Sequence, residues 1–462
     1  MLPDNKLLKG SFTPSRQPSV APVSDPVTRV IVIGAGYSGI AAANALKAHG
    51  VEVVVLEGRS SIGGRTKTVP LAGANVEAGG AWIHAPIGNP LSELADFLSL
   101  PRRAFPLSEI YNNLKLASHA GKELDGSERD RIMGLVDIVE EELMDSAFSC
   151  ESSQTIAEMI EVKLLEVSDS ELREWINFIL TTGFEADLAC AADDISMINY
   201  TCDAGYQGED DCIVNGYSAM LELLAKGCQI HCESVVSEIE QTSSGVTVRC
   251  ANGRIENGSH VILSVPLGVL KSGAIKFSPA LSSQKRFAIE QLGFGCFEKL
   301  VFQFNNSFWK TAENDARGIL IKDHPIFPYW VDVTVSPERP TLAAHVCGPK
   351  AIELSKLDDD TAFDMAMSAL SSACGGVPAV PVAWHRTNWL SDPFSCGAYT
   401  HIPPSVSLQE IDNLGKPEGR LLFAGEATSA ERFGYVDGAY ISGLREAQRL
   451  TGGRPVKISV RA

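Results

Sequence analysis

The stretch RVIVIGAGYSG, residues 29–39, joins a short apolar run to a turn that contains three glycines. The run predicts a buried strand, and the residues after the turn predict a helix from about Ser38 to Ala48. Residues 51–57, VEVVVLE, predict a second strand. Parallel strands need a crossover of this kind, so the fold is expected to begin with a βαβ unit.

The three glycines and an acid downstream predict a dinucleotide site. Gly34 allows the tight turn, Gly36 lets backbone approach a pyrophosphate, and Gly39 lets the helix pack on the strand. The helix N-terminus then offers free N–H groups to phosphate. Glu57 lies 23 residues after Gly34, at the end of the second strand, where a carboxylate can bind ribose hydroxyls. These residues predict a Rossmann-type domain without distinguishing FAD from NAD.

A second glycine turn follows at Gly63-Gly64-Arg65-Thr66. Its backbone and guanidinium could contact the same pyrophosphate. An ordinary glycine-rich turn with a surface arginine is the equal alternative, and the residues alone favour neither.

Composition narrows the class of protein. The chain has 462 residues, 45% of them hydrophobic, which is enough for two domains with buried cores. It contains no run of about eighteen apolar residues and no apolar segment after its first charges, so neither a membrane span nor a secretory signal is expected. The 11 cysteines show no metal or disulfide spacing. We therefore expect a cytoplasmic protein with reduced thiols, no metal and no membrane contact.

The charge of the chain bears on its partners. A formal net charge of -18 argues against a nucleic-acid partner, which requires basic surface. About twenty acidic residues lie between Asp137 and Asp211, against two basic ones, Lys163 and Arg173. Such a block can form an interaction surface, and acidic surface attracts cationic substrates. Solubility alone is the simpler explanation of the same charge.

Composition and periodicity predict the other elements. Residues 1–27, rich in Pro and Ser, are expected to form a disordered arm. Helices are expected over 127–147, 153–166, 169–183 and about 435–450. Strands are expected over 235–239 and 245–250 as a hairpin, and over 261–265, 297–304, 329–335, 341–346 and 421–424.

Four motifs together resemble the FAD-dependent amine oxidase family. They are Glu57-x5-Gly63-Gly64-Arg65, Gly79-Gly80-Ala81-Trp82-Ile83-His84, Phe423-Ala424-Gly425-Glu426-Ala427-Thr428-Ser429 and Gly434-Tyr435-Val436-Asp437-Gly438-Ala439-Tyr440. More narrowly, they resemble plant-type polyamine oxidases, over residues 28 to about 452. The resemblance implies an α/β, Rossmann-like FAD-binding domain and an α+β substrate-binding domain with a mixed sheet flanked by helices. The implied segments are 28–100, 205–290 and 396–453 for FAD, and 101–204 and 291–395 for the substrate.

The FAD contacts of the family map onto residues of this chain. They are Gly34, Gly36, Gly39, Glu57, Arg65, Ala81, Trp82, Val236, Glu426 and Val436. In this mapping the Val236 backbone holds the adenine and Glu426 holds the ribityl chain. Monoamine oxidases attach FAD through a Cys directly before an aromatic residue of the reaction site. Here Ala398 precedes Tyr399, so we expect non-covalent FAD.

The resemblance also assigns residues to the reaction site. Lys299 falls on the lysine that holds a water against flavin N5, although a lysine in an alternating strand usually faces solvent. Tyr399 and Tyr435 match the two aromatic residues that flank the amine, and core packing is the plain alternative for each. His84 matches a histidine of back-converting polyamine oxidases. Glu185 matches an acid of the substrate tunnel, or is an ordinary solvated residue at a helix end.

These matches imply oxidation of a secondary amine of spermine or thermospermine with O2, giving spermidine, 3-aminopropanal and H2O2. His84 is the marker of this back-conversion, since the extracellular plant enzymes carry an acid at the matching position. Two other functions stay open from the residues: a monoamine oxidase-like flavoenzyme, and a catalytically silent flavoprotein scaffold. The patterns indicate no oligomeric state.

Overall fold

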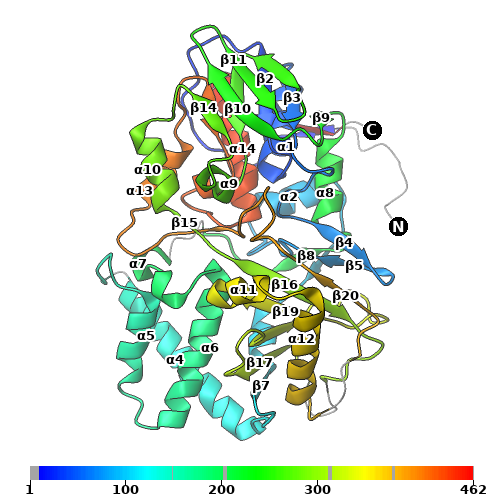
Figure 1. Cartoon of the computed structure of the whole chain (residues 1–462), viewed down its shortest axis with the longest axis vertical. Helices are drawn as coiled ribbons and strands as arrows, with labels where there is room; N and C mark the ends of the chain where they lie inside the picture. The colour runs from blue at the N-terminus through cyan, green and yellow to red at the C-terminus, as the bar shows by residue number, and fades with distance from the viewer. Residues whose placement is uncertain (1–9, 148, 201–204, 311–314, 377–379, 461–462) are drawn as a thin grey trace.

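A parallel sheet of five strands lies at the centre of one half of the molecule (Figure 1). The computed structural model describes residues 10–147, 149–200, 205–310, 315–376 and 380–460. The strand order is β22 (Leu421–Phe423), β13 (His260–Leu263), β2 (Arg29–Ile33), β3 (Glu52–Leu56) and β9 (Gln229–His231). Every neighbouring pair is parallel, and α1 (Tyr37–Ala48) connects β2 to β3. The predicted βαβ unit is confirmed.

Alternate residues of β2 face opposite layers. Val30 and Val32 pack with helices α1 and α14 (Val436–Leu450), whereas Ile31 and Ile33 pack against a second sheet. The order of that sheet is β12 (Ile255–Gly258), β11 (Val246–Cys250), β10 (Val236–Gln241) and β14 (Lys276–Ser278). The antiparallel pairing of β10 with β11 confirms the predicted hairpin. This half therefore has three layers, with the parallel sheet in the middle.

A six-stranded mixed sheet organises the other half (Figure 1). Its order is β20 (Ala383–Arg386), β16 (Phe297–Gln303), β19 (Thr341–Cys347), β18 (Tyr329–Asp332), β17 (Gly318–Lys322) and β7 (Leu114–Ser118). All pairs are antiparallel except β17 with β7. Helices α4 (Gly126–Ala147), α5 (Ile156–Leu164) and α6 (Ser170–Leu188) pack on one face, and α11 (Gly348–Ser355) and α12 (Asp359–Ala373) on the other. The predicted mixed sheet flanked by helices is confirmed.

The two sheets draw on separate segments of the chain. All strands of the parallel sheet lie within 28–100, 205–290 and 396–453, and all strands of the mixed sheet lie within 101–204 and 291–395. This distribution supports the division into a cofactor domain and a substrate domain, which we propose on that basis.

Shorter elements complete the fold. Three strand pairs are β4 (Thr68–Leu71) with β5 (Ala74–Glu77), β6 (Arg102–Ala104) with β8 (Asp211–Ile213), and β15 (Gly293–Phe294) with β21 (Thr400–His401). The remaining helices are α2 (Pro90–Phe97), α3 (Leu107–Asn112), α7 (Met197–Tyr200), α8 (Gly216–Ala225), α9 (Leu267–Lys271), α10 (Ser283–Gln291) and α13 (Gln409–Gly415). Among the described residues, no helix combines the length and apolar character that crossing a bilayer requires.

Part of the N-terminal segment is ordered. Residues 1–9 of the expected disordered arm lie outside the described residues. Further along, β1 (Gly10–Phe12) pairs antiparallel with β23 (Ile458–Val460), and Gln17 exchanges two hydrogen bonds with the backbone of Val456. The expectation of disorder is wrong for this stretch, because its partner is a strand at the far end of the chain, which local patterns do not reveal.

Helix α6 runs past its predicted end at residue 183. Gly183 stays inside the helix, which continues to Leu188 and stops at Ala189, a residue with a φ of 57°. A glycine costs a helix only about 1 kcal/mol, so packing of the last turn can override it. The extension carries two acids, Glu185 and Asp187.

We expect the contact between α1 and α14 to be sensitive to a single methyl group. A Cβ at Gly443 would lie 2.1 Å from the backbone oxygen of Ser38, so Gly443→Ala should force the helices apart and cost about 1–3 kcal/mol. A Cβ at Gly134 in α4 would meet open space, so Gly134→Ala should be neutral or stabilise by up to about 1 kcal/mol. Urea unfolding followed by circular dichroism measures both. Equal midpoints for the two variants would contradict the close packing.

Candidate functional site

A cavity of about 750 Å³ lies between the parallel sheet and the mixed sheet. One part of its lining comes from the turn between β2 and α1, with Glu57 and Val236. Another part comes from His84, Asp187 and Tyr200. A molecule in this cavity therefore contacts both halves of the protein.

The turn between β2 and α1 presents open backbone to the cavity. Gly34 has a φ of 101°, which residues with a Cβ rarely adopt. Gly39 lies behind the lining, where a Cβ would be 2.0 Å from the Gly34 carbonyl oxygen, so the helix packs on the turn as the motif predicts. Glu57 accepts hydrogen bonds from the N–H groups of Ala35 at 2.7 Å and Arg59 at 2.8 Å. These bonds hold the carboxylate beside the turn.

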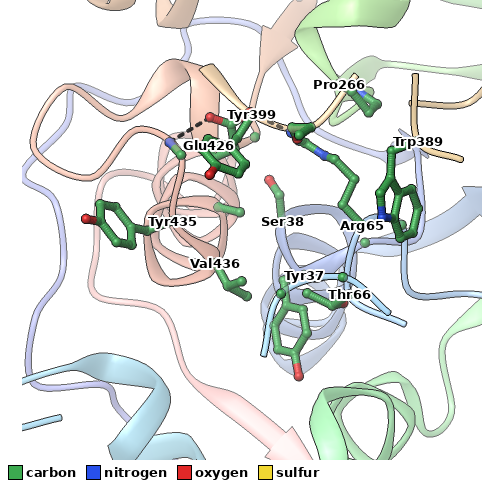
Figure 2. A pocket seen from close by; sticks show the side chains of 18 of the residues that line it. Tyr37, Ser38, Arg65, Thr66, Pro266, Trp389, Tyr399, Glu426, Tyr435 and Val436 are labelled. Carbon is green, nitrogen blue, oxygen red and sulfur yellow. Dashed lines mark hydrogen bonds and ion pairs between the residues drawn. The ribbon is translucent and has the colours of Figure 1, made fainter. Parts of the chain in front are cut away.

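The second glycine turn docks onto the first. The Gly63 N–H donates to the Ala35 carbonyl at 3.1 Å. Arg65 reaches across the cavity to Glu426, with Nη1 2.9 Å from Oε1 (Figure 2), and donates to the Ala398 carbonyl. The alternative of a surface arginine is therefore wrong.

The donors and acceptors gathered here fit FAD. Ala81, Trp82, Val236 and Val436 line the same cavity. Amide groups at a helix start and a nearby arginine are the donors that a pyrophosphate needs, and a buried carboxylate at a strand end suits ribose hydroxyls. We propose that the residues matched to the family's FAD contacts hold the cofactor, with Gly39 acting through packing.

Lys299 is buried on β16 and lines the cavity, which excludes a solvent-facing role. Its Nζ donates to the Gly79 carbonyl at 2.7 Å and lies 5.2 Å from the centre of the Trp82 ring. Burial lowers the pKa of Lys299 to about 8, and the Glu77 carboxylate opposes this change. Burial also raises the pKa of Glu77 to about 7. The Lys299 amine can therefore exchange a proton near neutral pH.

Two tyrosines line the cavity from different elements. The Tyr399 hydroxyl donates to the Ala186 carbonyl at 2.7 Å. The centres of the Tyr399 and Phe297 rings are 6.2 Å apart. Tyr435 is the residue before α14, and 38% of its surface is exposed. Its ring meets His84 edge to face, with centroids 5.2 Å apart. Burial raises the pKa of Tyr435 to about 12, so its hydroxyl keeps its proton at neutral pH.

Two acids that the sequence analysis did not single out lie beside His84. Asp210 Oδ2 is 2.7 Å from His84 Nδ1. Asp187 is open to the cavity, and Tyr200 donates to it at 2.6 Å. Burial raises the pKa of Asp187 although the hydrogen bond from Tyr200 lowers it. Both acids belong to the acidic block, but nothing in their spacing marks them as cavity residues.

Glu185 does not line the described cavity, and nothing there supports the tunnel role that its family match implies. Its Oε2 lies 3.2 Å from Nζ of Lys350 in α11. Residues two apart on an α-helix point about 200° apart. When Glu185 faces α11, Asp187 therefore faces the cavity.

Comparison with known proteins finds matches over most of the chain. Residues 37–451 match the family model described as flavin containing amine oxidoreductase. The chain is 32% identical to Polyamine oxidase 4 of Oryza sativa subsp. japonica, covering 90% of this chain and 87% of the rice protein. It is 34% identical to Lysine-specific histone demethylase 1 homolog 2 of Arabidopsis thaliana, covering 91% of this chain and 58% of that protein.

Solved structures share the fold at lower identity. Cyclohexylamine oxidase from Brevibacterium oxydans IH-35A superposes with a TM-score of 0.75 at 23% identity, over 92% of this chain and 99% of that chain. A redesigned putrescine oxidase, a triple mutant, gives a TM-score of 0.73 at 22% identity, over 91% and 98%. These similarities establish the fold and leave the substrate to the site itself.

We expect Lys299 to titrate near pH 8. Its raised acidity follows from burial, so the amine is protonated below that pH and reactive above it, whereas ordinary lysines become reactive near pH 10. Competitive acetylation across pH, with mass spectrometry of the Lys299 peptide, measures this. Glu77→Gln removes a favourable negative charge and should move the midpoint lower still.

Glu298→Gln is the matched control for the titration. Glu298 is a buried neighbour on the same strand, and its carboxylate is held by Thr387 and the N–H of Leu390. This variant should leave the Lys299 midpoint in place. The same midpoint in Glu77→Gln and wild type would contradict the assigned electrostatic cause.

Proposed function

The chain belongs to the flavin-containing amine oxidoreductases, and from this membership we propose that it is a polyamine oxidase that acts on a secondary amine. As a member of this family, the chain is an amine oxidase with a flavin as its redox cofactor. We propose non-covalent FAD, because Ala398 occupies the position directly before Tyr399.

The acids of the cavity carry the proposal for the substrate. Asp187 and Asp210 both line it, and Asp210 lies 2.7 Å from His84. Carboxylates in partly desolvated surroundings bind ammonium groups more strongly than surface acids do. A polyamine carries ammonium groups on both sides of the reacting nitrogen, whereas a simple monoamine has no second ammonium group. Rice Polyamine oxidase 4 is also among the similar proteins, which supports the same substrate class.

The residues of the reaction site have separable tasks. Bound FAD supplies the two-electron acceptor for amine oxidation. Tyr399 and Tyr435 narrow the cavity around the reacting nitrogen and orient the adjacent C–H bond. Lys299 Nζ holds and exchanges a proton near neutral pH. Asp187 fixes the register by binding a distal ammonium group.

We propose back-conversion as the reaction. Spermine or thermospermine reacts with O2 and water to give spermidine, 3-aminopropanal and H2O2. His84 supports this assignment because it replaces the acid of terminal-catabolising plant enzymes, and its ring lies against Tyr435. We further propose a cytoplasmic site of action, on intracellular polyamine pools.

Product analysis tests this proposal. Anaerobic spermine should bleach the yellow protein, and aerobic turnover should give spermidine as the main amine product. Benzylamine and a peptide with N-methylated lysine serve as the competing substrates, the latter because demethylase homologues are also similar. Formation of 1,3-diaminopropane would reverse the cleavage position, and preference for benzylamine would favour a monoamine oxidase. Full retention of colour with every amine would favour a silent scaffold.

We expect Asp187→Asn to raise the KM for spermine by about tenfold or more, since one charged hydrogen-bonded contact is worth about 1.5–3 kcal/mol. The KM for a monoamine should change far less. Glu185→Gln is the matched control, because it also neutralises a carboxylate, lies two residues earlier on the same helix, and is outside the cavity lining. Steady-state kinetics with both substrates decides. Equal effects of the two variants would contradict the assignment of Asp187.

A further inference from the structure

Arg432 connects the loop before α14 to the wall of the cavity. Its guanidinium lies 3.8 Å from the centre of the Tyr435 ring and 5.0 Å from the centre of the Tyr206 ring. Its Nε and Nη2 form two bonds to Asp437, at 2.7 and 3.2 Å. Arg432 and Asp437 are both buried, with side chains 8% and 4% exposed. The planar cation is therefore held in one orientation against the ring.

The stacked groups continue to the N-terminal segment. Arg16 lies 4.9 Å from the centre of the Tyr206 ring and pairs with Glu431 at 3.0 Å. Tyr206 is itself buried, and both guanidinium groups lie within about 5 Å of the centre of its ring. Beyond Tyr435 the series ends at His84, inside the cavity. A continuous series of side-chain contacts thus joins a segment near the chain start to the cavity.

We propose that Arg432 is a positioning residue, which fixes the Tyr435 ring for the reacting amine, and that Arg16 supports it through Tyr206. The inference rests on the proposed function only in assigning Tyr435 to the amine. Tyr435 precedes α14, and its side chain makes no capping bond to that helix in the described structure. Its ring orientation depends instead on the Arg432 guanidinium that stacks on it, which is attracted to the face of an aromatic ring.

The substitution Arg432→Lys separates the effect of stacking from the effect of charge. Arg432→Lys keeps a cation for Asp437 but loses the planar guanidinium that stacks on Tyr435. We expect kcat to fall about tenfold, with the KM for spermine changed less than about twofold, because a ring displaced by about 1 Å costs rate more than binding. In a Tyr435→Leu background the same substitution should have almost no further effect on kcat. Full activity in Arg432→Lys, or additive effects in the double variant, would overturn the proposal.

Arg420→Lys is the matched control. Arg420 is buried, pairs with Asp25 and donates to backbone carbonyls, and lies outside the cavity lining. Its replacement should leave kcat unchanged even if the thermal midpoint falls. A loss of kcat equal to that of Arg432→Lys would mean general destabilisation and would overturn the positioning role.

A second measurement does not depend on amine turnover. The chain has 9 tyrosines, and 3-fluorotyrosine labelling with Tyr435→Phe as the assignment variant identifies the Tyr435 resonance. In wild type we expect one sharp fluorine signal for Tyr435, and in Arg432→Lys a shifted and broadened one. Arg16→Ala should produce a smaller shift of the same signal, and an unchanged signal would remove the N-terminal segment from the proposal. An unchanged Tyr435 signal in Arg432→Lys would overturn the positioning role whether or not spermine is the substrate.

Discussion

Contact of backbone on backbone around α1 is the constraint on which the rest of the structure depends. The helix approaches its own preceding turn at Gly39 and approaches α14 at Gly443, and neither position has room for a Cβ. These two contacts fix α1 and α14 side by side on one face of the parallel sheet. Both helices then begin at the same cavity (Figure 2). One packing arrangement therefore fixes the positions of Tyr435 and of the amides at the start of α1 that we propose for phosphate.

Charges in the cavity differ in how they are held. Arg65 is paired with Glu426 and Arg432 with Asp437, so those arginines keep fixed partners. Lys299 instead donates to the neutral Gly79 carbonyl, while the Glu77 carboxylate acts on it through space. A neutral acceptor offsets less of the cost of burying an ammonium group than a carboxylate does. The Lys299 ammonium is therefore the labile cation of the cavity, whereas the two arginines keep their charge in fixed ion pairs.

Sequence patterns predicted the cofactor half better than the substrate half. Residues 29–57 form strand, turn, helix and strand from contiguous local signals, and the structure follows them closely. The pairing of β1 with β23 joins residues far apart in the chain, so the ordered stretch after residue 9 looked like a flexible arm. Lys299 looked solvent-exposed by strand alternation, because the pattern does not show that both faces of the mixed sheet are covered. Family motifs, and not periodicity, identified it.

Glu185 and Asp187, near the end of α6, show what local sequence patterns leave undetermined about a site. An α-helix turns 100° per residue, so an error in its end or phase exchanges one acid for another. Sequence patterns predict an end of α6 at residue 183 and point to Glu185, yet the extended helix turns Glu185 toward Lys350 and leaves Asp187 open to the cavity. That phase is set by where α6 packs against the mixed sheet and α11, which is a tertiary contact. The proposed substrate contact of Asp187 therefore depends on helix packing, whereas the cofactor turn depends on three glycines and their immediate neighbours.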